Sequence, residues 1–320
     1  MFLWVLKGGP GCGKSTLMKR IGGAAEAEGE QVEYIHCSGD PDSLDAVSVP
    51  LRGFAFVDGT APHVIEAACP GAASRYLDLS RFLDDGALRP RLAEIMELER
   101  RYKACYADAY AKLTALGELL PENAPGLHRE ETLRAAERTA EELAARELPS
   151  PGGHGTVRRR FLSAWTCRGR VSFAPDLPAS AHVTLVESEL GLGSVFLAKL
   201  GKLAIERRCG IVLCADPLEP EKTEAVLLPE AGLAYCAVGG GSPEIPGAKR
   251  SIPLDGFAGE TGRPDLSWRR SESERLIRAA VGSLHRAKEL HDELELLYRP
   301  HVDFSGVSAL TDALIRRLFP

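Results

Sequence analysis

The sequence predicts an α/β protein made of two domains, and three observations lead to this prediction. An apolar run at Phe2–Leu6 is followed by a glycine-rich loop and a helical pattern, which is the strand–loop–helix order of α/β proteins. The same order returns near residue 182. The length of 320 residues is about that of two ordinary domains, and Pro149–Gly155 has the composition of a linker. We therefore expect one domain at residues 1–150 and a second at 151–320.

The bulk composition excludes several classes of protein. Hydrophobic residues make up 44% and charged residues 26% of the chain, which are ordinary globular values. The net charge of −6 argues against a surface that holds nucleic acid through many phosphate contacts. No apolar run approaches the roughly 18 residues that span a bilayer, so we expect neither a nucleic-acid nor a membrane partner. Eight cysteines without CxxC or Cys/His ligand spacing predict reduced thiols and a cytoplasmic location.

The strongest motif is the loop that follows the first strand. It consists of Gly8, Gly9, Pro10, Gly11, Cys12, Gly13, Lys14, Ser15 and Thr16. The pattern G-x-x-x-x-G-K-S between a strand and a helix is typical of a loop that binds phosphate groups. Glycines let successive backbone N–H groups turn inward, and the helix adds its positive N-terminal end. The alternative interpretation is a glycine-rich turn without a ligand.

The polar residues at the end of this loop have separate expected roles. Lys14 would contact the β- and γ-phosphate oxygens, Ser15 would bind Mg²⁺ through its hydroxyl, and Thr16 would bond an α-phosphate oxygen. In this context the chain resembles the P-loop nucleoside triphosphatase superfamily. The resemblance implies P-loop-type, three-layer domains with mainly parallel sheets. No N-K-x-D or T-K-x-D sequence is present to recognise guanine, so we expect ATP as the ligand and Mg²⁺ as its cofactor.

A second group on the metal side is predicted at Asp58. The apolar strand Phe54–Val57 ends at Asp58-Gly59, and this carboxylate would hold Mg²⁺ through a water and act with Lys14 in catalysis. A turn-capping aspartate is the alternative. Because no glutamate stands beside Asp58, we expect slow hydrolysis or phosphoryl transfer to another acceptor.

The second half contains a degenerate copy of the first. His182–Val186 predicts a strand, and a loop and a helix follow it. Aligning Gly13 with Gly193 pairs Lys14 with Ser194, Ser15 with Val195, Gly8 with Ser188 and Asp58 with Ala237. In this alignment the phosphate cation and both metal-side groups are lost together. We therefore expect a second domain with a structural or regulatory role.

Each half also ends in long helical segments, around Arg89–Leu120 and Trp268–Tyr298. These predict a helical hairpin added to each domain. The whole arrangement is similar to an uncharacterised bacterial family of tandem P-loop ATPase-like proteins. The segments that carry this resemblance are Lys7–Met18, His36–Asp45, Asp58–His63, Arg160–Leu162 and Leu290–Glu295. The second copy has a segment, Arg159–Pro178, that the first lacks, so the translation start is expected upstream of Met1 or the first copy has lost this element.

Several residues near the loop are weaker candidates. An acceptor or water pocket beside the γ-phosphate would be lined by His36, Asp40, Asp42, Asp45 and His63, although such clusters also cap turns. Cys12 would be a redox-sensitive thiolate or simply a small side chain. Arg158-Arg159-Arg160 would supply an arginine to the γ-phosphate or form a solvated face. His154 lies in the linker and is expected to have no role.

Three functions stay open at this stage. The first is a slow Mg-dependent ATPase with one active and one degenerate site. The second is a small-molecule or nucleotide kinase with an acceptor that the sequence does not identify. The third is a nucleotide-gated binding protein whose output is a conformational change.

Overall fold

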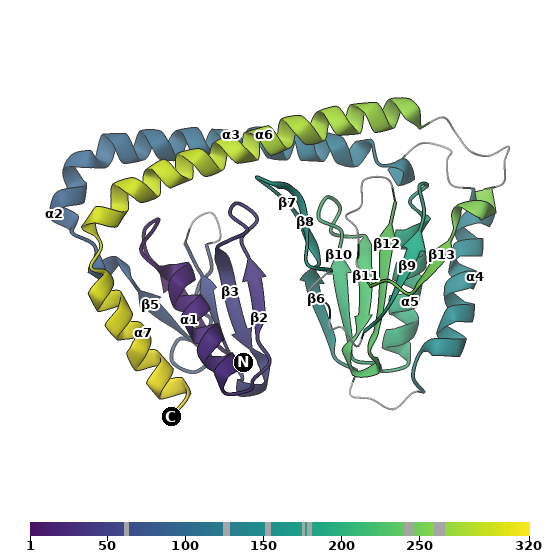
Figure 1. Ribbon diagram of the computed structural model, residues 1–320, viewed down its shortest axis with the longest axis horizontal. Coiled ribbons are helices and arrows are strands. Elements are labelled where there is room, and N and C mark those ends of the chain that lie inside the picture. The colour runs from purple at the N-terminus through teal and green to yellow at the C-terminus, as the bar shows by residue number, and fades with distance from the viewer. Residues whose placement is uncertain are drawn as a thin grey trace. The chain divides into compact units, whose positions relative to one another are not determined.

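The computed structural model describes residues 1–60, 64–123, 129–150, 155–174, 177, 181–239, 245, 247–258 and 266–320. It has two large sheets and a two-stranded hairpin, with helices packed against the sheets (Figure 1). The α/β class predicted from the sequence is confirmed. None of the helices in these residue ranges is both long and apolar enough to cross a membrane.

The two halves of the chain share most of their order of strands and helices. The first half has β1 (Phe2–Lys7), α1 (Lys14–Ala27), β2 (Glu33–His36), β3 (Leu44–Val49), β4 (Phe54–Asp58), β5 (Ser74–Asp78), α2 (Asp85–Leu88), α3 (Leu92–Glu118) and α4 (Glu130–Glu147). The second half has β6 (Val157–Phe161), β7 (Ser163–Thr166), β8 (Gly169–Ser172), β9 (His182–Glu187), α5 (Leu192–Glu206), β10 (Ile211–Ala215), β11 (Thr223–Leu228), β12 (Leu233–Val238), β13 (Arg250–Pro253), α6 (Ser267–Tyr298) and α7 (Phe304–Leu318). From β1 and from β9 onward the two halves share one order of strands and helices, except that α2 has no helical counterpart, and the second half adds three strands before β9.

The two sheets share one topology. The first has the order β2-β3-β4-β1-β5, and the second has the order β13-β9-β12-β11-β10-β6. Read in the opposite direction, the second sheet places β10, β11, β12, β9 and β13 where the first has β2, β3, β4, β1 and β5, and adds β6 beside β10. Only β3 and β11 run against their neighbours, so the prediction of largely parallel sheets is confirmed.

The strand register fixes which residues of the two halves correspond. Phe2 pairs with Phe54 in the first sheet and His182 pairs with Leu233 in the second, so β1 and β9 differ by 180 residues. The buried positions of the helices that follow, such as Ile21 in α1 and Leu200 in α5, differ by 179 residues. The left-handed residues after these helices, Gly29 and Arg208, also differ by 179. One residue is therefore missing from the loop between β9 and α5.

This position of the deletion corrects the sequence alignment, which kept the offset at 180 through the loop and helix. Lys14 corresponds to Gly193 rather than to Ser194, and Ser15 corresponds to Ser194 rather than to Val195. A Cβ built on Gly193 would lie 3.0 Å from the Cβ of Ala237, the counterpart of Asp58. The second copy has therefore lost the lysine and the aspartate but has kept the serine.

The chain forms two compact units that do not follow its halves. One unit contains Met1–Ala107 and Ser283–Pro320, and the other contains Asp108–Gly282. The sequence predicted domains at 1–150 and 151–320, which are simply the two halves of the chain. The boundaries of the compact units are different, because α4 belongs to the second unit and α7 to the first. Nothing in the amphipathic spacing of these helices identifies the sheet that each one covers.

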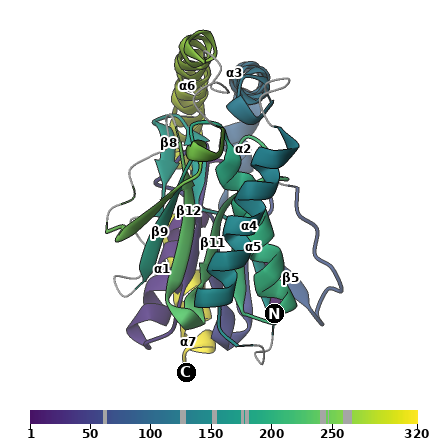
Figure 2. The ribbon, with the colours of Figure 1, turned by 90° about the vertical axis from the view of Figure 1, so that its right-hand side faces the viewer.

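In each unit one helix comes from the opposite half of the chain and packs on the helix that lies on the sheet. In the second unit α4 packs along α5, and Ala140, Leu143 and Ala144 share a core with Leu197 and Leu200 (Figure 2). In the first unit α7 packs along α1, and Leu314 joins the core beneath α1. This exchange differs from the expected hairpin within each half, because α4 and α7 leave the half that encodes them.

The long helices α3 and α6 likewise pair with each other rather than within one half. Inside the first unit, Leu98 and Tyr102 of α3 share a core with Leu290 and Leu294 of α6. Inside the second unit, Arg269 near the start of α6 donates to the carbonyl of Glu118 at the end of α3. The pairing is therefore antiparallel, and it brings the C-terminal end of α6 into the first unit.

Two adjacent glycines in α1 test how tightly this helix lies on the first sheet. A Cβ at Gly22 would come within 2.4 Å of Cε1 and Oη of Tyr34, whereas a Cβ at Gly23 would meet nothing within 4 Å. We expect Gly22→Ala to lower the free energy of unfolding by about 1–2 kcal/mol, because Tyr34 must move. Gly23→Ala should raise it by about 0.5–1 kcal/mol, because alanine favours a helix. Urea denaturation of both variants measures this, and a Gly22→Ala protein as stable as wild type would contradict the packing described.

Candidate phosphate-binding site

The β1–α1 loop lies at the carboxyl edge of the first sheet. β1 is flanked by β4 and β5 in parallel orientation, and Leu6 of β1 is in register with Asp58 of β4. The loop that leaves β1 therefore starts next to Asp58, at the edge where α/β sheets bind ligands. The sequence-predicted pair comes together here, because Lys14 Nζ lies 3.6 Å from Asp58 Oδ2.

Lys14 is held inside the loop. Its ammonium donates to the carbonyl oxygens of Gly9 at 2.9 Å and Gly8 at 3.2 Å. The Lys14 side chain is only 11% exposed, and an ammonium so far from water is costly unless hydrogen bonds and an opposite charge compensate it. The loop carbonyls and Asp58 provide both.

Asp58 has one oxygen engaged in a turn and one that faces Lys14. Oδ1 accepts from the backbone N–H of Thr60 at 2.9 Å and from its hydroxyl at 2.6 Å. The turn-capping interpretation thus describes Oδ1, and a metal role would use Oδ2. The sequence analysis did not single out Thr60, although Asp-Gly-Thr carries the signal of such a turn.

Ser15 and Thr16 lie in the first turn of α1. The Ser15 hydroxyl oxygen accepts from the backbone N–H of Leu44, at the start of β3, at 3.0 Å. Thr16 is exposed. A hydroxyl has two acceptor lone pairs, so Ser15 keeps one for another partner.

The loop presents backbone donors that the protein does not use. Gly11 and Gly13 have left-handed backbone angles, with φ of 63° and 94°. Within the described parts of the chain, the N–H groups of Gly9, Gly11, Gly13 and Thr16 make no hydrogen bond. Together with the positive end of α1, these donors suit an anion.

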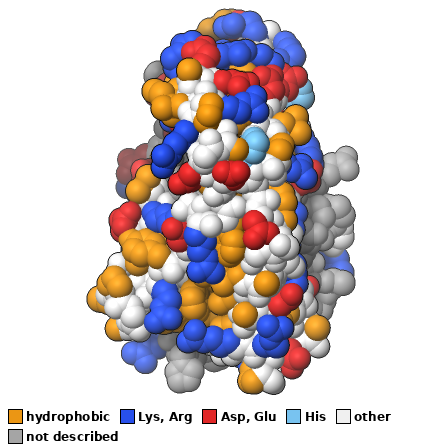
Figure 3. Space-filling view, turned by 90° about the vertical axis from the view of Figure 1, so that its left-hand side faces the viewer, with side chains coloured by type: hydrophobic (Ala, Val, Ile, Leu, Met, Phe, Trp, Pro, Cys, Tyr) orange, Lys and Arg blue, Asp and Glu red, His pale blue; other side chains and the backbone are white. Residues whose placement is uncertain are grey.

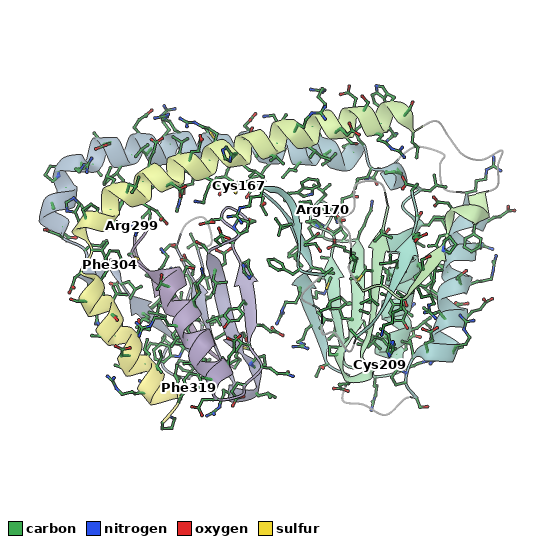
Figure 4. The ribbon with its side chains drawn as sticks, in the orientation of Figure 1. Cys167, Arg170, Cys209, Arg299, Phe304 and Phe319 are labelled. Atoms are coloured by element: carbon green, nitrogen blue, oxygen red, sulfur yellow. The ribbon has the colours of Figure 1, made fainter. Side chains whose placement is uncertain are left out.

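The end of α6 packs against the outer side of this loop, which the sequence analysis did not anticipate. A Cβ at Gly9 would come within 2.9 Å of the Tyr298 ring, and a Cβ at Gly11 would lie 3.1 Å from Arg299 Cγ. Figure 4 shows Arg299 at the junction of α6 and α7, beside the loop. These two glycines are therefore also required for packing, so they do not by themselves indicate a ligand. The charged groups at the loop carry that argument.

Arg299 brings a further positive charge to the loop. Its side chain is exposed, and no ion pair or hydrogen bond joins its guanidinium to another described residue. No sequence motif marks it, because it lies more than 280 positions after the loop and reaches it only through the pairing of α6 with α3.

An open cavity adjoins the same region. It has a volume of about 380 Å³ and is lined by Arg81, Phe82, Leu83, Asp84, Pro300, His301, Val302 and Asp303. Leu83 also lies 3.5 Å from a Cβ built on Gly9, so one residue of the cavity lining packs against the start of the loop. Its two acidic residues are engaged as helix caps, Asp84 to Ala87 and Asp303 to Gly306.

Cys12 is buried inside the loop rather than poised for reaction. Its side chain is 1% exposed, and its sulfur would lie 2.7 Å from a Cβ at Gly8. Burial raises the pKa of the thiol above its ordinary value, and the nearby Lys14 charge offsets this only in part. The geometry favours the interpretation of Cys12 as a small side chain that fills the loop.

The polar residues after β2 hold their own loop together. His36 Nδ1 donates to the carbonyl of Pro41 at 2.7 Å. The Asp40 carboxylate accepts from the Asp42 N–H at 3.2 Å and the Ser43 hydroxyl at 3.0 Å. Burial first, and then the charge of Asp45, raise the pKa of Cys37 to about 12. The loop-capping interpretation accounts for these contacts.

The other candidates belong to other elements or fall outside the described residues. Arg158, Arg159 and Arg160 are in β6, the strand at one edge of the second sheet. His63 and His154 fall outside the described residues. No group of three or more His, Cys, Asp or Glu side chains in the described ranges could hold a metal ion, so a metal at Ser15 and Asp58 would need ligands from phosphate or water.

The surface on this side of the first unit has no single dominant charge. Figure 3 shows Lys and Arg side chains interspersed with hydrophobic and acidic ones on the face in view.

Comparisons of the chain with protein-family models, with curated proteins and with solved structures found no match. The function must therefore be argued from the geometry of the site.

The burial of Cys12 gives a direct test with Cys69 as the exposed control. We expect iodoacetamide to label Cys69 within minutes and Cys12 only after unfolding, because the thiolate is the reactive form and burial suppresses it. Because the pKa of Cys12 is raised, labelling should stay slow until the pH exceeds the ordinary thiol value. Peptide mass spectrometry of the native protein measures both sites, and equal labelling of Cys12 and Cys69 at pH 8 would contradict the buried geometry.

Proposed function

We propose that the first unit is a P-loop-type domain that binds Mg·ATP at the β1–α1 loop and hydrolyses it slowly. The observation that carries this proposal is the combination of unused N–H donors with the Lys14–Asp58 pair at one edge of the sheet. Free amides beside a nearly buried ammonium form a group of donors that suits an anion. The G-x-x-x-x-G-K-S pattern supports the same conclusion.

Each residue then has a defined part in binding. Lys14 would exchange its loop carbonyls for phosphate oxygens, and the N–H groups of Gly9, Gly11 and Gly13 would ring a phosphate. Ser15 and Asp58 would hold Mg²⁺, which neutralises phosphate charge and orients the groups that react. Thr60 fixes the Asp58 carboxylate through Oδ1, and this leaves Oδ2 for a metal-bound water.

Lys14 is also the residue expected to lower the barrier to phosphoryl transfer. Negative charge develops on the transferred oxygens, and a fixed ammonium in a water-poor site stabilises that charge. The residue after Asp58 is Gly59, so no neighbouring carboxylate is present there to activate water. Slow turnover follows from this arrangement.

A nucleotide-gated conformational output is the second candidate, and one contact favours it. The glycines that would ring the phosphate are those on which Tyr298 and Arg299 pack. A change in the conformation of the loop on binding would therefore alter the packing of Tyr298 and Arg299 at the C-terminal end of α6. No comparable observation favours the kinase alternative, because His36 and Asp40 are engaged by groups of their own loop and Asp40 also by Lys288 of α6.

Titration calorimetry of ATP and Mg²⁺ into the full chain tests the proposed site. We expect Lys14→Ala to weaken ATP binding about 100-fold or more, because charge-assisted bonds to phosphate are lost. Asp58→Asn should mainly reduce the dependence of affinity on Mg²⁺. Lys19→Ala, on the exposed side of the same helix, is the matched control and should bind normally. Absence of ATP binding by the wild-type protein, or unchanged binding by Lys14→Ala, would refute the proposal.

Arg299 tests whether the α6 end takes part in the site. We expect Arg299→Ala to weaken ATP binding about 10-fold through loss of a charge-assisted contact, and Arg299→Lys to recover part of it. Arg316→Ala removes an exposed arginine on α7 and serves as the control. Identical ATP affinities for Arg299→Ala and Arg316→Ala would show that α6 only packs beside the loop.

A further inference from the structure

Three backbone donors of the second unit's loop are occupied by side chains of the protein itself. The Ser188 hydroxyl oxygen accepts from the N–H groups of Leu192 at 2.9 Å and Leu190 at 3.2 Å. The Asp255 carboxylate accepts from the Glu189 N–H at 2.8 Å and from the Ser188 hydroxyl at 2.7 Å. A carboxylate thus binds the start of this loop as an external anion would.

The sheet register identifies the residue of the first unit that corresponds to Asp255. Trp4 pairs with Arg75 in the first sheet, and its counterpart Thr184 pairs with Arg250 in the second. Four residues later in each chain segment is a fully buried leucine, Leu79 or Leu254.

The leucines confirm the correspondence through their backbones. The N–H of Leu79 donates to the Lys7 carbonyl at 2.8 Å, and that of Leu254 donates to the Glu187 carbonyl at 2.9 Å. The next residue begins a 3-10 turn in both units, η2 (Ser80–Phe82) and η7 (Asp255–Ala258). Ser80 is therefore the counterpart of Asp255.

The two loops differ in what this residue does. The Ser80 hydroxyl donates to Asp78 Oδ1 at 2.6 Å, away from any loop amide. Gly9, the counterpart of Glu189 by the strand offset of 180, makes no hydrogen bond through its N–H to a described residue. The exchange of serine for aspartate at this position thus distinguishes the Gly9 amide, which is unused, from the Glu189 amide, which binds a carboxylate.

We propose that the residue at this position, Ser80 in one unit and Asp255 in the other, controls whether the first amide of the loop is open to an external phosphate. Asp255 occupies the Glu189 amide of the second loop, and Ser80 leaves the Gly9 amide of the first loop open. The inference deepens the proposed function and rests on it, because it names a residue that keeps the first loop accessible to phosphate.

Competition explains the effect. A carboxylate attached to the same chain is always present at a high effective concentration, so a phosphate must displace it from the Glu189 amide. The phosphate would also face the repulsion of the displaced carboxylate and of Glu187 and Glu189. The retained Ser194 cannot restore binding, since Lys14 and Asp58 have become Gly193 and Ala237.

The experiment transfers the closing residue to the open loop. ATP and Mg²⁺ are titrated into the full chain carrying Ser80→Asp, with Ser80→Asn as the uncharged variant of nearly equal shape. Ser80 is exposed, so both substitutions are expected to fold, and thermal denaturation verifies this. Ser80→Asp should weaken ATP binding at least about 100-fold, while Ser80→Asn should stay within about threefold of wild type.

Asp255→Asn provides the reciprocal control, because it alters the second loop and should leave ATP affinity unchanged. Equal affinity of wild type and Ser80→Asp would overturn this inference and leave the proposed function intact. Equal losses in Ser80→Asp and Ser80→Asn would also overturn it, since shape and not charge would then be responsible. Failure of the wild-type protein to bind ATP would overturn both. Ser80→Glu, with its longer side chain, should reproduce the loss if Ser80→Asp proves unstable.

Discussion

The contact between the Lys14 ammonium and the Asp58 carboxylate is the interaction on which the site depends. It exists because β1 and β4 are adjacent and parallel, so that the residue after Val57 lies beside the loop that leaves Leu6. Parallel neighbours deliver their carboxyl ends to one edge, and the helix that begins at Lys14 turns its positive end to the same place. The loop glycines meet two requirements. Gly11 and Gly13 adopt left-handed backbone angles, and Gly9 and Gly11 leave room for the close packing of α6.

Much of this local structure follows from the sequence. The apolar run at Phe2–Leu6, the glycines and the helical spacing after Lys14 predicted β1, the loop and α1, because strand and helix periods are local properties. The similarity of the two halves predicted a shared topology, and the sheets have it. The position of the one-residue deletion could not be predicted, because glycines recur in both loops and either alignment preserves some of them. Only the buried positions of α1 and α5, which differ by 179 residues, identify Gly193 rather than Ser194 as the counterpart of Lys14.

The partners of the helices could not be predicted for a different reason. An amphipathic pattern shows that a helix has an apolar face, but not which surface covers that face. Leu143 of α4 and Leu314 of α7 are buried, yet each lies in the unit formed mostly by the other half. The residues that this pairing brings to the loop, Tyr298 and Arg299, carry no motif.

The exchange of α4 and α7 has a consequence for the origin of the duplication. A lone ancestral repeat would have left uncovered the side of α1 on which α7 packs, because its own last helix belongs on another sheet. Two identical chains that traded these helices about a twofold axis would have covered both. Fusion of such a homodimer into one gene would then have freed the copies to diverge, so that one loop could keep its lysine while the other lost it.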